Sequence, residues 1–399
     1  MQRARVVVLD HTAKEGGAEL ALLRVCRRLY PERFDISVLV FEDGAFVTRL
    51  RAAGIPAEAL PLSDDVAHAS RTDLLASPLA LLRRTAGALW FVPRLARAIR
   101  ATRADLIVAN SLKAAVFASV VAPLTRRPWV WHLHDRLTTD YLSKPLVTML
   151  HILAVVGPRG IVVNSRATLA TLPRRVAGKV TVAYPGLDPA EFHSSARPAE
   201  VTVVGMVGRI SPTKGQREFL RAAARIADEH PDARFRIVGA ALFGEHGYEA
   251  EIRALPARLG VDDRVEFAGW VDDPAAEVGG LAVLVHASPV PEPFGQVVVE
   301  AMAAGVPVVA TDAGGVTEIL EPNGSGIATS GPWRVTPFGV LVSPGDDAAL
   351  ADAIRWVLTN ADERERKAAA AQEYAINRFS IARTADAVYS AWDGVLNSR

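Results

Sequence analysis

Two glutamates eight residues apart, Glu292 and Glu300, mark the segment of this chain with the clearest chemistry. Glu292 stands between two prolines, which indicates a loop, and Glu300 lies in an apolar run that is typical of a helix. Gly305 is placed to end that helix, and Val306–Ala310 is predicted to form the buried strand that follows. We therefore expect two carboxylates near one helix N-terminus, whose N–H groups suit a sugar joined to a phosphate.

A second loop, Gly208–Gly215, places two cations between a predicted strand and a helix predicted over Gln216–Glu229. Arg209 and Lys214 would lie beside the helix N-terminus, where they could neutralise a diphosphate and stabilise it as a leaving group. Arginine and lysine are more often solvated surface residues. The position of this pair directly after a strand favours the binding role.

The first predicted strand is followed by Gly16-Gly17-Ala18-Glu19, which opens a helix predicted over Ala18–Leu29. Glycines allow close backbone approach and a helix start supplies amide donors, so the motif could bind phosphate. An ordinary tight turn would use the same residues. Gly205 and Gly208 do not have the spacing of a dinucleotide-binding fingerprint, which argues against a dehydrogenase.

Two histidines, His132 and His134, follow another apolar strand, and Asp135 comes directly after them. Such a cluster could ligate zinc, but the sequence offers no third convergent ligand. We therefore expect His134 to form hydrogen bonds in a cleft, and we predict no metal site. The pairs Asp64-Asp65 and Asp272-Asp273 are predicted to be solvated turn carboxylates.

The stretch Arg71–Arg103 carries seven arginines and one acid, interleaved with leucines and aromatic residues. An interfacial membrane segment has this pattern. An amphipathic helix packed on a sheet, with its arginines in water, has the same pattern, and the sequence alone does not separate the two.

Apolar strand patterns alternate with helical patterns along the whole chain, which is typical of parallel sheets covered by helices. The break in this alternation falls at Pro189–Glu200. We predict two α/β domains, over 1–188 and 200–380, each a doubly wound sheet of six strands, with ligands outside the carboxyl ends of the strands. The predicted strands are Val6–Leu9, Ile36–Val40, Leu106–Ala109, Val130–His132, Ile161–Val163, Val180–Val182, Val201–Val207, Arg234–Val238, Val265–Phe267, Ala282–His286, Val306–Ala310 and Gly339–Leu341.

The composition is that of a soluble globular protein, with half of the 399 residues hydrophobic and 22% charged. A net charge of +1 gives no overall attraction to nucleic acid, which is not an expected partner. The single cysteine, Cys26, excludes internal disulfides and is consistent with a reducing, cytoplasmic location. The apolar stretch Pro145–Val163 is interrupted by charged and helix-breaking residues, so a helix, a turn and a strand are expected there rather than a membrane span.

Taken together, the motifs resemble those of the retaining glycosyltransferases of family 4, or glycosyl transferase group 1. That family has the GT-B fold, two Rossmann-like domains facing across a cleft. The resemblance covers nearly the whole chain and rests on the segments 16–19, 207–215, 292–310 and 314–318. The segment 292–310, with its two glutamates, is highly specific. At 184–186, Tyr-Pro-Gly departs from the family's usual Asn-Gly-Val.

The resemblance implies a role for each matching residue. Glu292, His134, Arg209 and Lys214 are the candidate catalytic residues: Glu292 and His134 would lie at the donor sugar, and the two cations at its diphosphate. Glu300 would hold the ribose hydroxyls. A C-terminal helix, about 381–399, would cross back onto the N-terminal domain. The remaining donor-binding residues implied are Gly16, Gly17, Trp270, Val271, Phe294, Gly295, Gln296 and Val297.

The implied activity is retaining, metal-independent transfer of a hexosyl group from a nucleotide-diphosphate sugar, with no further cofactor. The two glutamates would hold hydroxyls, and the leaving diphosphate would take the acceptor's proton. The acceptor would be a glycan, a lipid-linked molecule or a small molecule. A lipid-linked or cell-envelope glycan acceptor of polysaccharide biosynthesis, with peripheral contact to the inner face of the membrane, is a separate prediction that rests on the pattern of 71–103. A sugar-nucleotide epimerase of the same fold and a non-catalytic nucleotide-sugar-binding protein stay open as alternatives.

Overall fold

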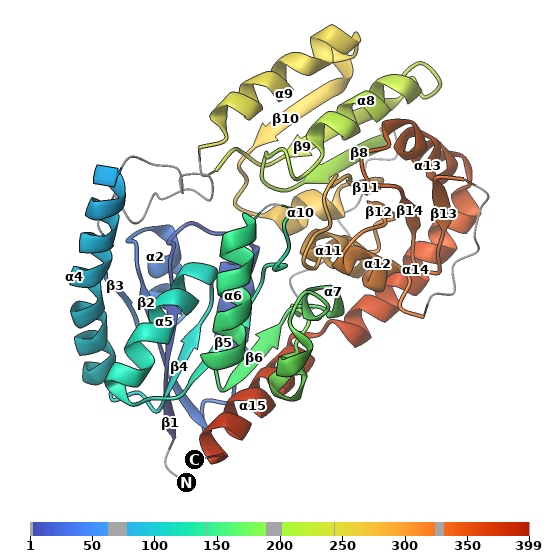
Figure 1. Ribbon diagram of the computed structural model, residues 1–399. Coiled ribbons are helices and arrows are strands. Elements are labelled where there is room, and N and C mark those ends of the chain that lie inside the picture. Colours follow the sequence, from blue (N-terminus) through green and yellow to red (C-terminus); the bar gives the residue numbers. More distant parts are fainter. Residues whose placement is uncertain are drawn as a thin grey trace. The chain divides into compact units, whose positions relative to one another are not determined.

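The computed structural model describes residues 3–62, 78–140, 142–188, 202–242, 244–323 and 331–398. The chain divides into two compact units (Figure 1). Unit 1 is Met1–Gly186 together with Ile381–Arg399, and unit 2 is Leu187–Ser380. The sequence predicted a first domain ending at 188, a second over 200–380 and a returning helix from 381. The predicted linker over 189–200 lies outside the described residues.

Unit 1 contains a seven-stranded parallel sheet in the order β3-β2-β1-β4-β5-β6-β7. All six strands predicted for this part of the chain are present. The seventh, the edge strand β3, has the sequence Ala-Glu-Ala, which contains no β-branched residue and no apolar run, so it was not predicted. The strands are β1 Ala4–Asp10, β2 Phe34–Val40, β3 Ala57–Ala59, β4 Leu106–Ala109, β5 Trp129–Leu133, β6 Gly160–Val163 and β7 Val180–Val182.

Helices cover both faces of this sheet and form two separate apolar layers. On one face α1 (Gly17–Arg28), α2 (Ala45–Ala52) and α15 (Ile381–Asn397) pack around a core that includes Trp392. On the other face α4 (Pro78–Thr102), α5 (Leu112–Thr125) and α6 (Lys144–Val156) lie side by side (Figure 1). Two short helices, α7 (Arg166–Leu169) and η2 (Arg174–Lys179), precede β7.

Unit 2 repeats the plan, with the strand order β10-β9-β8-β11-β12-β14-β13. Only the edge strand β13 runs antiparallel, and it was not predicted. The strands are β8 Thr202–Val207, β9 Ala233–Val238, β10 Val265–Gly269, β11 Val283–His286, β12 Val308–Thr311, β13 Trp333–Val335 and β14 Val340–Val342. The helices are α8 Gln216–Ile226, α9 His246–Leu259, η4 Asp262–Arg264, α10 Pro274–Gly279, α11 Gln296–Ala303, α12 Gly315–Leu320, α13 Asp347–Thr359 and α14 Ala361–Arg378.

Both sheets reverse their strand order once, and this reversal locates the candidate site. Unit 1 reverses between β1 and β4, and unit 2 reverses between β8 and β11. At such a switch point the connections after the two central strands run to opposite sides of the sheet, which leaves a crevice outside the carboxyl ends of these strands. Ligands of open α/β sheets usually bind in this crevice. The two predicted doubly wound domains are thus confirmed, and each has one such place.

The stretches considered for membrane contact fold as parts of unit 1. Pro145–Val163 forms most of α6, a turn and β6, as predicted. In the described part of Arg71–Arg103, which begins at α4, Phe91, Leu95 and Ile99 are buried in the core. This part therefore has the arrangement of a packed amphipathic helix, while 71–77 lies outside the described residues. No described helix combines the length and the apolar character needed to cross a membrane.

Candidate functional site

In unit 2 the loops after β8 and β11 meet in an ion pair between Lys214 and Glu292. The Lys214 Nζ lies 2.6 Å from the Glu292 Oε1. The Ser288 hydroxyl donates to the same oxygen at 2.6 Å, and the His286 Nε2 lies 3.3 Å from it. One carboxylate oxygen is thus surrounded by three polar groups, in a side chain that is only 11% exposed.

This surrounding fixes the charge state of Glu292. Burial by itself raises the pKa of the carboxyl, but the Lys214 ammonium and His286 outweigh it and hold the pKa well below its usual range. Glu292 is therefore an ionised acceptor at neutral pH. An acceptor of this kind suits the hydroxyl-holding role predicted from the sequence better than the role of a general acid.

Two glycines bring the loops this close together. Gly215 has a φ of +84°, and a Cβ there would lie 2.0 Å from the backbone oxygen of Ala287, directly after β11. Gly314 has a φ of +66°, and its Cβ would lie 2.1 Å from the backbone oxygen of Glu292. The Gly315 N–H donates to that oxygen at 2.9 Å. Only glycine fits these positions, because the backbones approach closely and both φ values are positive.

Helix α11 begins directly after the Glu292 loop. Gly295 is its N-cap, with a φ of +101°, and Gln296 is its first residue. The first turn of a helix presents N–H groups that no residue of the helix accepts, so this end favours an anion. Glu300 lies one turn further along and accepts from the Gln296 Nε2 at 3.0 Å. The helix ends at Ala303, and Gly305 follows with a φ of +68°, as predicted.

The other predicted residues of unit 2 lie at the same carboxyl edge of the sheet. Arg209 follows β8 and is half-buried, and its backbone oxygen accepts from the Gln216 Nε2 at 2.9 Å. Trp270 and Val271 follow β10, and the Trp270 side chain is 54% exposed. Phe294 is buried, with its ring 5.7 Å from that of Phe379.

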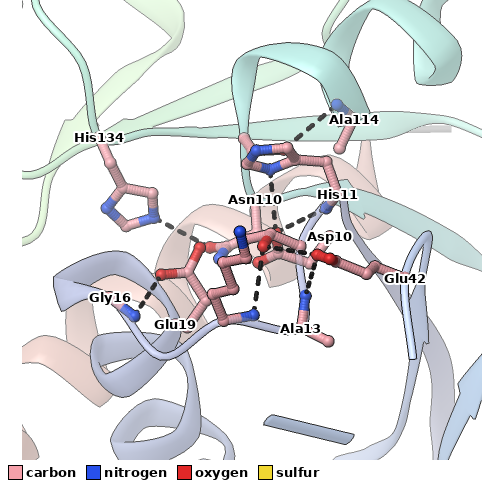
Figure 2. A network of polar contacts seen from close by, with 12 residues as sticks. Asp10, His11, Ala13, Gly16, Glu19, Glu42, Asn110, Ala114 and His134 are labelled. Carbon is pink, nitrogen blue, oxygen red and sulfur yellow. Dashed lines mark hydrogen bonds and ion pairs between the residues drawn. The ribbon is translucent and has the colours of Figure 1, made fainter. Parts of the chain in front are cut away.

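Unit 1 has a polar network at its own switch point (Figure 2). Asp10 at the end of β1 is fully buried and accepts from the Asn110 Nδ2 at 2.7 Å. The His11 backbone N–H donates to the same carboxyl at 2.6 Å. The Asn110 Oδ1, after β4, lies 2.9 Å from the Nε2 of His134, after β5. The network thus joins three strand ends to the histidine that the sequence singled out.

The network also sets the tautomer of His134. The Asp10 carboxyl accepts from the Nδ2 of Asn110, so the amide of Asn110 turns its oxygen to His134. The His134 Nε2 must then carry the proton, which leaves Nδ1 as an acceptor. Burial lowers the pKa of His134, so the ring stays neutral. His134 is therefore prepared to accept a hydrogen bond from a hydroxyl group.

The Gly16-Gly17 motif forms the start of α1, one residue earlier than predicted. The Gly16 N–H donates to the Glu19 Oε2 at 3.0 Å, so the Glu19 side chain reaches back to the N-cap backbone of α1. Gly16 is extended, so no left-handed turn is required there. Burial, followed by the nearby Asp10 charge, raises the pKa of Glu19 to about 8. Glu19 is thus a neutral carboxylic acid at neutral pH, beside the Asp10–Asn110–His134 network.

The remaining polar pairs have structural roles. The His132 Nε2 accepts from the Trp392 Nε1 at 3.0 Å, and burial, followed by the proximity of His134, lowers the pKa of His132 to about 3. The lone pair that a metal would need is therefore used by Trp392. Asp273 caps α10 by accepting from the Ala276 N–H at 3.1 Å, as a turn carboxylate. Asp64-Asp65 lies outside the described residues.

Four polar residues of these clusters were missed by sequence reasoning. Each lies at or just after a strand end, and this position is the only signal that could have found it. Serine, histidine, asparagine and aspartate occur in too many other contexts to stand out by type. The missed residues are Asp10, Asn110, His286 and Ser288.

Two doubly wound sheets, each with a polar cluster at its switch point, define a two-domain protein of the GT-B class. Comparison with family models matches residues 15–191 to Glycosyltransferase Family 4 and residues 188–374 to Glycosyl transferases group 1. The two matches together take in most of the chain, and the chain belongs to family 4 of the glycosyltransferases.

Relatives and solved structures agree with this assignment. D-inositol 3-phosphate glycosyltransferase of Stackebrandtia nassauensis is 31% identical over 301 residues, which cover 67% of this chain and 64% of that protein. The match thus spans just under two thirds of that relative. The 2-deoxystreptamine glucosyltransferase of Streptomyces kanamyceticus is 29% identical, covering 77% of this chain and 82% of the relative. The structure of Anabaena Alr3699/HepE in complex with UDP and glucose is 29% identical, with a TM-score of 0.81 over 98% of this chain and 100% of that one.

Proposed function

We propose that this chain transfers a glycosyl group from a UDP sugar to an acceptor hydroxyl, with retention of the anomeric configuration. The observation that carries the proposal is the Lys214–Glu292 pair beside the N-terminus of α11. It combines a cation and a helix N-terminus for phosphate with an ionised carboxylate for hydroxyls. A UDP sugar is the donor to test first, because Alr3699/HepE was also solved with UDP-glucose.

The chemistry needs no covalent nucleophile. The bond from the sugar C1 to the β-phosphate oxygen breaks, the acceptor oxygen bonds to C1 on the same face, and the acceptor's proton passes to the leaving diphosphate. Lys214, Arg209 and the α11 N-terminus would stabilise the charge that develops on the diphosphate. These groups do the work that a metal ion does in other enzymes, so we propose metal-independent transfer.

For the acceptor we propose a polyhydroxylated ring. The names of the relatives refer to inositol phosphate, 2-deoxystreptamine and, for a Mycobacterium leprae protein 30% identical to this chain, phosphatidyl-myo-inositol. The neutral His134, with Nδ1 as an acceptor, suits a ring hydroxyl of donor or acceptor. The proposal includes an acceptor ring that is part of a lipid-linked or cell-envelope glycan at the cytoplasmic face of the membrane.

The test is to incubate the protein with UDP-glucose and a panel of cyclitols and glycans, with and without EDTA, and to measure UDP release. The anomeric proton coupling of the product, by NMR, gives its configuration. We expect an α-linked product from the α-linked donor, unaffected by EDTA. Glu292→Gln and Lys214→Ala should each abolish transfer, whereas a change at an exposed residue of α8, Arg221→Gln, should not.

Three outcomes would contradict the proposal. Epimerised donor without acceptor would identify an epimerase. Binding of UDP sugars without turnover over the whole panel would favour a non-catalytic binding protein. A β-linked product would exclude retention.

A further inference from the structure

An unusual share of the exposed apolar surface lies on one side of unit 1. Among the described residues, ten large hydrophobic side chains are exposed, and seven of them belong to α4, α5 and α6. These three helices are neighbours in one layer (Figure 1). Singly exposed hydrophobic residues need no explanation, but a cluster on adjacent helices indicates an interaction surface.

The apolar residues form two outward stripes. On α5, Val116, Val120 and Leu124 recur every four residues and are 37%, 45% and 52% exposed. On α6, Met149, Ile152 and Val156 recur at helical spacing and are 44%, 59% and 75% exposed. The opposite sides of both helices are buried in the sheet core. We call these six side chains the α5–α6 face. Its stripes follow the helix period, so one side of each helix is apolar and faces solvent.

The charge around this face is predominantly positive, and Asp105, at the edge that carries Arg103 and Arg126, lies 3.7 Å from the guanidinium of Arg127. Helices α4, α5 and α6 contain no aspartate or glutamate. From 78 to 187 the sequence has sixteen lysines and arginines against three acids, although the whole chain has a net charge of +1. Positive charge is therefore concentrated in this part of the chain, and the rest of the chain is acidic overall. Lys144 and Arg159, at the two ends of α6, are both exposed.

Two arginines beside the face adopt a backbone conformation that favours glycine. Arg103 and Arg126 have φ values of +52° and +54°, and they are the only non-glycine residues with positive φ among those described. They directly follow α4 and α5, so both lie near the start of the next strand, at the same edge of the sheet. Both are exposed. Glycine or asparagine would take this conformation with less strain, so an arginine at each position costs stability.

We propose that the α5–α6 face, with Arg103, Arg126 and Arg159 at its edge, docks on an anionic lipid bilayer. Apolar side chains would enter the interface between headgroups and acyl chains, and the arginines would bind the anionic headgroups. A second copy of the chain fits less well, because pairing of this face with itself would bring together two predominantly basic surfaces whose helices contain no acid. The proposal extends the proposed function by naming the surface that would contact a membrane. None of these residues belongs to the site described above, so vesicle binding and transfer can fail separately.

Vesicle flotation of the full chain tests this directly. We expect the protein to float with phosphatidylcholine vesicles that contain phosphatidylglycerol, to be released by high salt, and not to float with phosphatidylcholine alone. The double variant Arg103→Gly/Arg126→Gly removes two basic groups and should weaken binding about 30-fold. Glycine suits both φ values, so the melting temperature of this variant should be unchanged or raised, which separates lost binding from lost folding.

The double variant Ile152→Ser/Val156→Ser tests the apolar contribution, and it should also reduce flotation. Ile376→Ser and Arg221→Gln are the matched controls on unit 2, where Ile376 is 39% exposed and Arg221 is exposed. Transfer to a water-soluble acceptor should be the same in all these variants. Failure of the wild type to float at low salt, or equal flotation of all variants, would overturn the proposal. A concentration-dependent dimer that Ile152→Ser dissociates, without vesicle binding, would assign the face to a second copy instead.

Discussion

The Glu292 side chain illustrates how neighbouring residues decide what a carboxylate can do. Two glutamates in one segment first suggest an acid and a base. The contacts of Glu292 with Lys214, Ser288 and His286 instead keep it ionised. Glu300 accepts a hydrogen bond from Gln296. A carboxylate with its pKa well below the usual range is a poor proton donor at neutral pH. The pair is thus suited to holding hydroxyl groups.

The Lys214–Glu292 pair can be tested by a mutant cycle. Lys214→Met should leave a buried carboxylate without its cation and destabilise unit 2 by about 1–3 kcal/mol. Glu292→Gln should cost less, because an amide needs no counter-charge. In the double variant the stability should recover relative to Lys214→Met, while transfer stays absent. Thermal and urea unfolding provide the measurement. A double variant as unstable as the sum of the single changes would show that the two groups are not coupled.

Glu19 predicts a pH dependence of the stability of unit 1. Its pKa of about 8 in the fold is above the ordinary value of 4.5. The folded state therefore keeps a proton that the unfolded chain releases, so rising pH favours unfolding. The contribution is fully present below the unfolded pKa and is lost as the pH rises through about 8. Glu19→Gln keeps an acceptor for the Gly16 N–H and should make the stability flatter over this range. Equal pH profiles of unfolding for both proteins would disprove the shift.

Residue types explain why only part of the site could be predicted. Glu292 was found because it belongs to a long, specific motif, and Lys214 because its loop directly follows a predicted strand. Asp10 and Asn110 belong to no motif, and their pairing depends on β1 and β4 being neighbours, which about a hundred intervening residues conceal. The tautomer of His134 follows from that pairing alone, so no inspection of its own segment could have predicted it.

At the scale of elements, close loop contacts position the site more than the helices and strands do. The loop that carries Lys214 touches the end of β11 through Gly215, where no side chain fits. The predicted strands of both units exist because buried parallel strands are short, apolar and easy to recognise. The edge strands β3 and β13 were missed because a charged residue interrupts each of them: their sequences are Ala-Glu-Ala and Trp-Arg-Val. A close contact between a loop and a strand end leaves no pattern in the sequence except a glycine.

Gly215→Ala tests this contact. The new Cβ would lie 2.0 Å from the Ala287 oxygen, so the Lys214 loop must move away from β11. We expect loss of UDP affinity by calorimetry, together with a loss of stability greater than backbone strain alone causes. Gly260→Ala is the matched control: its φ is +73°, but a Cβ there would meet nothing within 4 Å. That variant should lose only about 1 kcal/mol of stability and no affinity. Similar effects in both variants would show that strain, rather than the clash, is responsible.

On the scale of the whole molecule, the C-terminus completes the N-terminal unit. Helix α15 packs against α1, β6 and β7, and Trp392 is fully buried. Its indole donates to the Nε2 of His132, two residues from His134. Thr384 and Val388 line a cavity of unit 1 together with His134. The last nineteen residues therefore support the network of Asp10, Asn110 and His134, although almost two hundred residues of unit 2 separate them from the rest of unit 1.

A chain ending at Ser380 should consequently lose unit 1 and keep unit 2. Without α15, the apolar layer that includes Phe34 and Val162 is exposed to solvent. It also loses the Trp392 side chain, which is part of this layer. We expect two unfolding transitions in the full chain, since its units have separate cores, and only one in the truncated chain. Trp392→Phe is the graded control: it keeps most of the ring packing, removes the bond to His132 and should cost about 1–3 kcal/mol in unit 1 alone. Limited proteolysis would identify the unfolded unit. A truncated chain with both transitions intact would mean that α15 is an accessory helix, and that unit 1 can form its core and hold His134 without it.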